Sequence, residues 1–269
     1  MTQTKIQNTI KNTPPENYEV YFVPVIGKPV AEDLLKTAKL HKGENVLDVA
    51  CGTGVVARMV RERVGPEGKV DGLDINPGMI DVAKKITPSN ENIQWHVASA
   101  EGMPMEDNTY DVVMCQMGLQ FMEDKESALK EMHRVLDPEG RMLLNVPGPA
   151  AELFNIMDNA LEKHISHAAS RFVEKVFSLY DSEEIKNMMI RAGFHDINVI
   201  QEKISLRLPL PKNFFWQYIS STPLSAEISN ADENKSKALE KEVVEKWEKY
   251  VRNGEMVYEQ QLTIVTAGK

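Results

Sequence analysis

The sequence predicts an α/β fold in which strands and helices alternate around a mostly parallel sheet. Short apolar segments recur at residues 46–50, 69–73, 92–97, 110–115 and 140–146, and amphipathic segments separate most of them. Alternation of this kind implies right-handed crossovers and a parallel sheet with helices on both faces. Helices with the matching periodicity are expected at residues 28–41, 54–64, 77–85 and 124–135.

The regular alternation pauses after Pro147. Apolar positions at helical spacing predict one long helix over residues 150–177. Asp181 or Ser182 is expected to cap a further helix that ends at Gly193, before a strand at 197–208. A final strand is expected at about 257–266.

The domain organisation expected from this layout is one domain over residues 1–269. Its core covers about 28–147, 181–208 and 257–267, and insertions at about 148–180 and 209–255 form a mainly helical cap. The second insertion holds an aromatic cluster, Phe214 to Trp216. If these aromatic side chains face a ligand, that ligand is a small apolar or amphipathic molecule.

A glycine-rich turn follows the first strand of the core. The run from Val46 to Gly54 ends in Gly52-Thr53-Gly54, and Asp74 closes the next apolar strand. A strand, a glycine-rich turn, a helix and an acid-tipped strand form the βαβ unit that binds a ribose-containing cofactor at the carboxyl edge of the sheet. The site is therefore expected at this edge.

Two cofactor classes fit that spacing. Residues 52–57 match the dinucleotide pattern G-x-G-x-x-A, which leaves an NAD-dependent oxidoreductase as one alternative. Asp48 favours S-adenosylmethionine (SAM), because a carboxylate repels a pyrophosphate and attracts the ammonium and sulfonium groups of SAM. Asp48 can also serve only to accept hydrogen bonds from amides of the turn.

Four motifs carry a resemblance to a known family. They are Asp48–Gly54, Gly72–Met79, Ala100–Pro104 with the acids Asp107 and Asp111, and Glu131–Gly140. In this order they resemble the class I SAM-dependent methyltransferases, in particular the small-molecule branch that includes the quinone-biosynthesis methyltransferases. The resemblance implies a Rossmann-like sheet of seven mostly parallel strands with an antiparallel last strand. It also implies that SAM is the methyl donor and S-adenosylhomocysteine the product.

The resemblance also implies roles for particular residues. The turn receives the methionine part of SAM, Asp74 holds the ribose, and apolar residues beyond it pack on adenine. At the position where the family usually has an acid for the adenine amino group, this chain has Ser99, followed by Ala100. The residues expected to bind the cofactor are Asp48, Ala50, Cys51, Gly52, Thr53, Gly54, Asp74, Ile75, Met79, Ser99, Ala100, Gln116, Met117, Gly118 and Tyr21.

Composition excludes several other functions. A net charge of −9 with dispersed acids argues against a nucleic-acid partner. Cys51 and Cys115 are expected to be small buried residues in a reducing cytoplasm, and no His, Cys or carboxylate spacing indicates a metal site. With no apolar stretch long enough to span a membrane, we expect a cytoplasmic protein. The sequence leaves the oligomeric state open.

Methyl transfer needs few catalytic side chains, because the positive sulfur already activates the methyl group. His164 is the candidate general base, since it lies on the apolar stripe of the first cap helix; the alternative is a structural histidine with a hydrogen-bond partner. The function expected is methylation of a small molecule. A quinone-type C-methyltransferase, a non-catalytic SAM-binding sensor and the nicotinamide enzyme are the alternatives.

Overall fold

The computed structural model describes residues 12–269, and the chain divides into two compact units. Unit 1 contains residues 12–27, Pro149–Ser178 and Lys203–Gln260. Unit 2 contains Lys28–Gly148, Leu179–Glu202 and Gln261–Lys269. Each unit therefore gathers segments that are far apart in the sequence.

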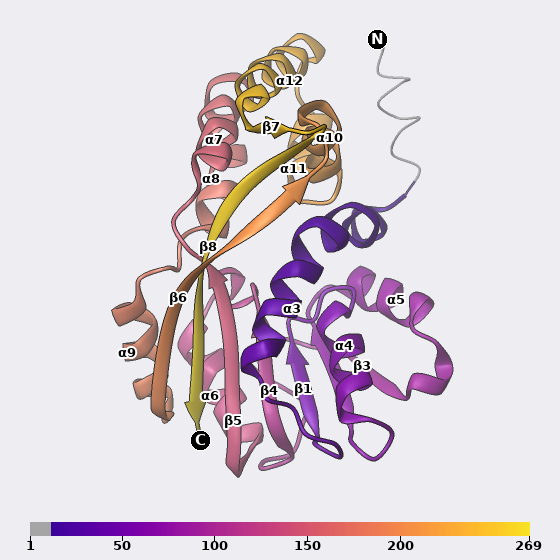
Figure 1. Ribbon diagram of the computed structural model, residues 1–269, viewed down its shortest axis with the longest axis vertical. Coiled ribbons are helices and arrows are strands. Elements are labelled where there is room, and N and C mark those ends of the chain that lie inside the picture. Colours follow the sequence, from indigo (N-terminus) through magenta and orange to yellow (C-terminus); the bar gives the residue numbers. More distant parts are fainter. Residues whose placement is uncertain (1–11) are drawn as a thin grey trace. The chain divides into compact units, whose positions relative to one another are not determined.

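Unit 2 holds the sheet and the helices that cover it (Figure 1). Two of its strands, β6 and β8, also contribute residues to unit 1. In chain order the elements are α3 (Lys28–Thr37), β1 (Val46–Val49), α4 (Val55–Val64), β2 (Val70–Asp74), α5 (Pro77–Ile86), a 3₁₀ turn (Ser89–Glu91), β3 (Ile93–Val97), β4 (Tyr110–Gln116), a 3₁₀ turn (Leu119–Phe121), α6 (Lys125–Val135), β5 (Leu136–Pro147), α9 (Ser182–Ala192), β6 (His195–Leu208) and β8 (Glu255–Gly268).

The strands are arranged in the order β3-β2-β1-β4-β5-β8-β6. Strand β1 pairs in parallel with β2 and with β4, while β5 pairs antiparallel with β8. This confirms the expected mostly parallel sheet with an antiparallel last strand. One further strand was not expected: β7 (Val251–Arg252) pairs with the start of β8, and it is too short to produce a periodic pattern.

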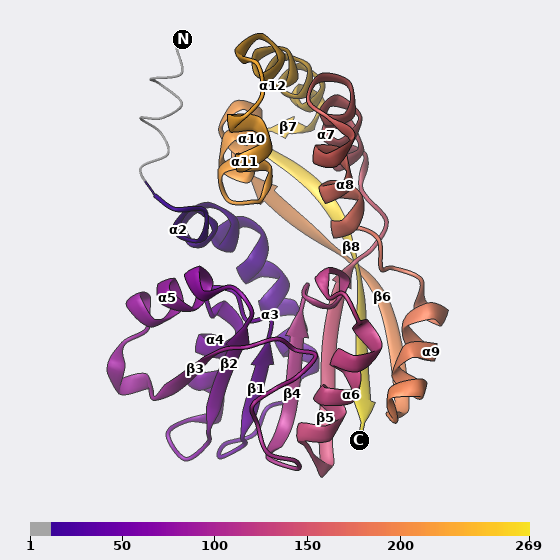
Figure 2. The same cartoon turned by 180° about the vertical axis from the view of Figure 1, so that it is seen from behind.

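Helices cover both faces of the sheet in unit 2. Figure 1 shows α3 and α4 in front of the strands, and Figure 2, from behind, shows α6 on the opposite face. The face under α6 and α9 carries an apolar core that includes Leu47, Val113, Leu144, Met132 and Met189. Burial of apolar side chains under the helices on both faces of the sheet fixes the strand ends that form the site.

Unit 1 is mainly helical. Its elements are α2 (Pro14–Asn17), a π-helical segment (Tyr18–Gly27), α7 (Glu152–His164), α8 (His167–Val176), α10 (Pro211–Ser220), α11 (Leu224–Ser229), α12 (Glu233–Trp247), a 3₁₀ turn (Glu248–Tyr250) and β7. Asn17 ties the first segment to α10 by donating to the carbonyl of Ser220 at 3.2 Å. The Trp247 indole N–H donates to the carbonyl of Leu153 at 2.8 Å, which joins α12 to α7.

The expected long helix over 150–177 is wrong in one respect, because the chain breaks between α7 and α8. Ser166 caps α8 by accepting from the amide of Ala169 at 3.1 Å. The break also shifts the buried stripe, so that Ala169 and Val173 are buried while Ala168 is exposed. The apolar spacing continued across the break, and the serine cap was the signal that it interrupted the helix.

Helix α9, which follows α8, has the predicted ends. Asp181 accepts from the amides of Glu183 and Glu184, and Gly193 ends α9 with φ of 105°. Among residues 12–269, no helix combines the length and hydropathy that crossing a membrane requires.

Candidate functional site

The turn after β1 is built from residues with left-handed backbone. Ala50, Gly52 and Gly54 have φ of 57°, 55° and 84°. The amide of Cys51 still pairs with the carbonyl of Leu73 at 3.0 Å, and the amide of Gly54 closes the turn on the carbonyl of Cys51 at 2.8 Å. Helix α4 then begins at Val55. The turn therefore puts backbone, rather than side chains, at the carboxyl end of β1.

Trp95 explains why two glycines are needed beside this turn. It lies opposite Gly72 in the β2–β3 register. A Cβ at Gly54 would come within 2.2 Å of the Trp95 indole, and a Cβ at Gly72 within 2.5 Å. The indole thus packs directly against the turn at Gly54. Sequence reasoning did not single out Trp95, because its contact with Gly54 depends on the register of a neighbouring strand.

Asp48 is a buried carboxyl group with one unused oxygen. It is 1% exposed, and its Oδ2 accepts from the amide of Ala57 at 3.0 Å. Oδ1 has no hydrogen-bond partner among residues 12–269. Burial, with a smaller contribution from the nearby charge of Asp74, raises the pKa of Asp48 to about 8. One oxygen thus serves the first turn of α4, and the binding of a cation by the other stays a prediction.

Asp74 connects the turn to the segment after β2. Its Oδ2 accepts from the amide of Gly52 at 2.8 Å, and its Oδ1 accepts from the amide of Asn76 at 2.8 Å. Burial raises the pKa of this carboxyl group, and the two backbone hydrogen bonds oppose that shift. A carboxylate oxygen has lone pairs beyond one amide contact, so ribose hydroxyls can still donate to Asp74.

Apolar side chains beyond β2 and β3 are open to solvent. Ile75 is 70% exposed and Val97 is 53% exposed, while Met79 is partly buried at the start of α5. Asn76 caps α5 by accepting from the amide of Gly78 at 2.9 Å, which fixes the helix start beside Ile75. An exposed apolar surface at this edge is suited to the flat face of a base.

Ser99 and Ala100 form the turn that follows β3. The Ser99 hydroxyl accepts from the amide of Glu101 at 3.2 Å, and Ala100 is 8% exposed. The carboxylate of Glu101 accepts from the amides of Glu123 and Asp124, at 3.0 Å each. This turn is consequently tied to the loop that precedes α6.

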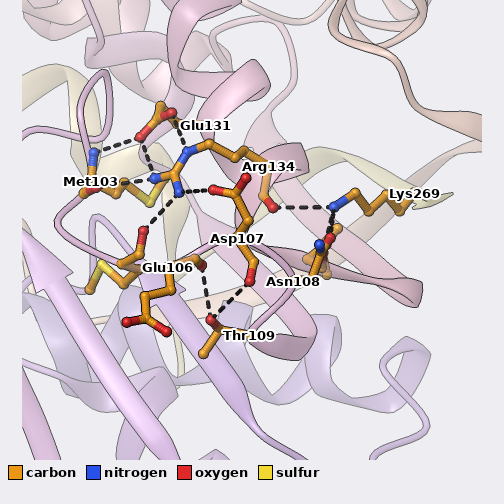
Figure 3. A network of polar contacts seen from close by, with 10 residues as sticks. Met103, Glu106, Asp107, Asn108, Thr109, Glu131, Arg134 and Lys269 are labelled. Carbon is orange, nitrogen blue, oxygen red and sulfur yellow. Dashed lines mark hydrogen bonds and ion pairs between the residues drawn. The ribbon is translucent and has the colours of Figure 1, made fainter.

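The loop after that turn is held by an ion-pair network on α6, shown in Figure 3. Arg134 donates to the carbonyls of Met103 and Met105 at 3.1 and 2.8 Å, and to Asp107 at 2.6 Å. Glu131 accepts from Arg134 and from the amide of Met103 at 2.8 Å. The guanidinium lowers the pKa of Glu131. Met103, Met105 and Asp107 of the third motif and Glu131 and Arg134 of the fourth therefore form one network that anchors the chain beyond Ser99.

The segment after β4 is held as tightly as the turn after β1. Met117 has φ of 50°, and its amide donates to the backbone carbonyl and the side-chain oxygen of Asn145, at 2.9 and 3.1 Å. The Gln120 side chain donates to the carbonyl of Met117 at 2.9 Å. A Cβ at Gly118 would lie 2.5 Å from the Cβ of Ala50, so the two loops are in close contact through Gly118.

The predicted residues fall into two groups. Those from Asp48 to Gly118 all belong to unit 2, at the carboxyl ends of β1 to β4. Tyr21 and His164 belong to unit 1, where Tyr21 is partly buried in the π-helical segment. His164 Nε2 lies 2.7 Å from Glu242 Oε2, and Lys163 and Lys246 bind the same carboxylate. These contacts lower the pKa of Glu242 to about 2, and the hydrogen bond from Lys163 contributes most.

The two cysteines are buried thiols. Burial raises the pKa of Cys115 to about 12 and that of Cys51 well above its usual range, so neither is a nucleophile at neutral pH. Within the described part of the chain, no set of His, Cys, Asp or Glu side chains is arranged to hold a metal ion.

The residues present fit SAM. Asp48 offers a buried oxygen to a cationic group, and the left-handed turn offers backbone to the methionine part. Asp74 can accept from ribose hydroxyls, and Ile75 provides an apolar surface for adenine. A pyrophosphate would instead bring no cation to the buried oxygen of Asp48.

Comparison with known proteins agrees with this chemistry. Residues 46–140 match a family described as "Methyltransferase domain". A demethylmenaquinone methyltransferase of Staphylococcus epidermidis is 35% identical over 178 residues, covering 62% of this chain and 74% of that protein. The corresponding Staphylococcus aureus enzyme is 33% identical over 178 residues, again covering 62% of this chain and 74% of that protein.

Solved structures share the fold at low identity. The YcgJ protein of Bacillus subtilis is 18% identical with a TM-score of 0.59, covering 90% of this chain and 98% of that one. Phosphoethanolamine N-methyltransferase 2 of Haemonchus contortus, solved with S-adenosylhomocysteine, is 19% identical with a TM-score of 0.60. The match covers 98% of this chain and 59% of that one. The nicotinamide and sensor alternatives receive no support. The chain belongs to the class I SAM-dependent methyltransferases and is an enzyme whose methyl donor is SAM.

Proposed function

We propose that this enzyme methylates a small apolar or amphipathic molecule, and that the acceptor is a quinol-type aromatic ring methylated at carbon. The observation that carries the proposal is the 35% identity to a demethylmenaquinone methyltransferase over 178 residues. Of the acceptor classes named among the relatives and structures cited above, this one comes with the highest sequence identity; the structural likenesses are 19% identical or less and support the fold alone.

The composition of unit 1 supports an apolar acceptor. The Phe154 ring lies 4.9 Å from Phe177, 5.5 Å from Tyr218 and 5.8 Å from Tyr258, centroid to centroid. Burial raises the pKa of both tyrosines, so their hydroxyl groups stay neutral. These four side chains are at most 6% exposed, so unit 1 has an apolar, aromatic interior rather than a charged one, as an apolar acceptor would require.

The chain's own residues have limited chemical work to do. When bound, SAM supplies a methyl group already activated by its positive sulfur. Asp48 would present a carboxyl oxygen to a cation, Asp74 would orient the ribose, and the loops after β1 and β4 would hold the methionine end. Holding reactants in one orientation is the main source of rate in such a reaction.

An acceptor assay tests the proposal. The purified chain would be incubated with SAM carrying a deuterated methyl group and, separately, a demethylated naphthoquinol in detergent, a catechol and phosphoethanolamine. We expect label only in the naphthoquinol, and carbon NMR should place it on the ring. Label on oxygen or nitrogen, or in phosphoethanolamine alone, would contradict the proposal. The Asp74→Ala variant, with a weakened cofactor site, is the negative control.

The sequence predicts a catalytic role for His164, but its 2.7 Å contact with Glu242 favours a structural one. His164→Gln keeps a hydrogen-bonding side chain but removes the basic ring. We expect this variant to melt at a lower temperature and to keep kcat within about threefold of the parent, because removing a general base would cost about a hundredfold or more. A loss of that size, at unchanged KM for SAM, would establish His164 as the base. Glu242→Gln is the matched control for the lost ion pair.

A further inference from the structure

Met117 is a strained residue at the centre of the cofactor edge. Its φ of 50° lies in the left-handed region, which is unfavourable for residues other than glycine, asparagine and aspartate. Such a conformation persists only where the surroundings hold it in place. The residues that hold Met117 are therefore part of how this edge is formed.

Two buried amide side chains hold it from opposite sides. The amide of Met117 donates to the side-chain oxygen of Asn145 at 3.1 Å. The same amide donates to the backbone carbonyl of Asn145 at 2.9 Å. Gln120 donates to the carbonyl of Met117 at 2.9 Å. Because an amide N–H only donates and a carbonyl only accepts, Met117 fixes the orientation of both side-chain amides.

These contacts come with a cost that a surface interaction would not have. Asn145 and Gln120 are both 0% exposed. The other end of each amide, Asn145 Nδ2 and Gln120 Oε1, has no hydrogen-bond partner within residues 12–269. Burying half-satisfied amides is unfavourable, so packing alone does not account for amides at these two positions.

The conformation of Met117 leads directly into the contact between the two cofactor loops. The next residue, Gly118, lies against the Cβ of Ala50, which itself has φ of 57°. A change in the backbone at Met117 would therefore move Gly118 relative to the turn after β1. This turn carries Gly52 and Gly54, two of the residues expected to receive the methionine end of SAM.

We propose that Asn145 and Gln120 are positioning residues that clamp Met117 in its left-handed conformation and thereby lock the loop after β4 onto the turn after β1. The inference goes beyond the proposed function, since it concerns how the SAM site is preorganised and not which acceptor is used. Its readout is cofactor affinity. The acceptor assay can therefore fail without affecting this result, and the reverse also holds.

The test combines clamp variants with glycine at position 117. Asn145→Leu and Gln120→Leu keep approximate size and burial but remove the hydrogen bonds to Met117. In the parent chain we expect each to weaken S-adenosylhomocysteine binding about tenfold by calorimetry. In a Met117→Gly background the clamp has no strain to hold, because glycine adopts this φ freely. There we expect the same substitutions to change affinity by less than about threefold.

Leu143→Ala is the matched control. Leu143 is 1% exposed and lies on β5 two residues before Asn145. It should lower the melting temperature but leave affinity within about twofold of the parent. Hydrogen exchange at residues 117–121 gives a second readout, which we expect to become faster in Asn145→Leu and to stay unchanged in Leu143→Ala.

The proposal has definite contrary outcomes. Unchanged affinity in both leucine variants would show that Met117 does not need the clamp. Equal losses in the parent and in the Met117→Gly background would show that Asn145 and Gln120 act by another route, as ordinary structural residues. A loss in Leu143→Ala equal to that in Asn145→Leu would have the same meaning.

Discussion

The cofactor edge of unit 2 has two halves that differ in burial. In the inner half, at the ends of β1 and β4, Asp48, Gln120 and Asn145 are at most 1% exposed. In the outer half, beyond β2 and β3, Ile75 is 70% exposed and Val97 is 53% exposed. The inner half also holds the strained residues Ala50 and Met117, whereas the outer half has ordinary helix and turn geometry.

The difference corresponds to what each half would do for SAM. The inner half would receive the reacting end, where a small displacement lowers the rate strongly, so its geometry is set during folding by buried polar contacts. The outer half would receive adenine, whose flat apolar face tolerates small shifts. Order is thus concentrated where the chemistry requires it.

Asp74→Ala breaks the link between the halves and should have the largest effect. Asp74 accepts from Gly52 in the inner half and from Asn76 in the outer half, besides its expected ribose contact. A hydrogen bond to a charged group is worth roughly 1.5–3 kcal/mol, so we expect affinity for S-adenosylhomocysteine to fall at least about a hundredfold. Calorimetric titration measures it.

Asp81→Ala is the matched control for Asp74→Ala. Asp81 is an exposed acid on α5, and its removal changes the net charge by the same amount. We expect its affinity to stay within about twofold of the parent. Equal affinity in the two variants would mean that the ribose is held elsewhere.

Gly118→Ala disturbs the inner half alone. The new Cβ would lie 2.5 Å from the Cβ of Ala50 and 3.0 Å from the sulfur of Cys115, so one of the loops must move. Overpacking of this kind costs about 1–3 kcal/mol, and we expect affinity to fall about thirtyfold. Gly102→Ala, where nothing lies within 4 Å of the added atom, should bind like the parent. A parent-like affinity in Gly118→Ala would show that the loop contact is not needed.

The sequence was sufficient for the parts of the fold and site that depend on local spacing. The alternation of strands and helices in the core, the turn at Gly52 to Gly54 and the acid Asp74 follow from short motifs whose geometry is local. Whether these residues bind SAM stays a prediction, which the titrations above test. Ser166 is also a local signal, because a serine cap marks the start of α8. The apolar spacing alone continues across this break and predicts one long helix.

The remaining features could not be predicted, because they depend on contacts between distant strands. Trp95 supports Gly54 only once β3 is in register with β2. Asn145 reaches Met117 only because β5 pairs with β4 so that Asn145 lies opposite Gln116. A buried asparagine in an apolar strand was the available signal for Asn145, since buried amides need partners.

Asp48 provides a pH test of the inner half. Burial raises its pKa to about 8, far above the usual range of an aspartate, so the folded chain holds this proton in a pH range where the unfolded chain has lost it. The stability of the free protein should therefore fall as pH rises from about 4 to about 8. A bound cation favours the ionised carboxylate, so cofactor binding should release a proton below about pH 8.

Calorimetry in two buffers of different ionisation enthalpy measures the proton released. At about pH 6.5 we expect about one proton per S-adenosylhomocysteine bound, and an affinity that rises with pH by at most about tenfold per unit. Asp48→Asn should bind about tenfold more weakly and release no proton. The same proton release in Asp48→Asn would assign the titration to another group and leave Asp48 as a structural acid.

Ile75→Ala tests the outer half and should have the smallest effect. Because Ile75 is 70% exposed, truncating it removes little buried contact and should leave the melting temperature of the free protein unchanged. Adenine would cover this side chain, so the truncation should remove about 1 kcal/mol of apolar contact and weaken binding about fivefold. Ile190→Ala, which truncates a 54% exposed isoleucine on α9, is the control and should bind normally. If Ile75→Ala instead lost as much affinity as Gly118→Ala, the outer half would be as strictly organised as the inner half, and the comparison between them would fail.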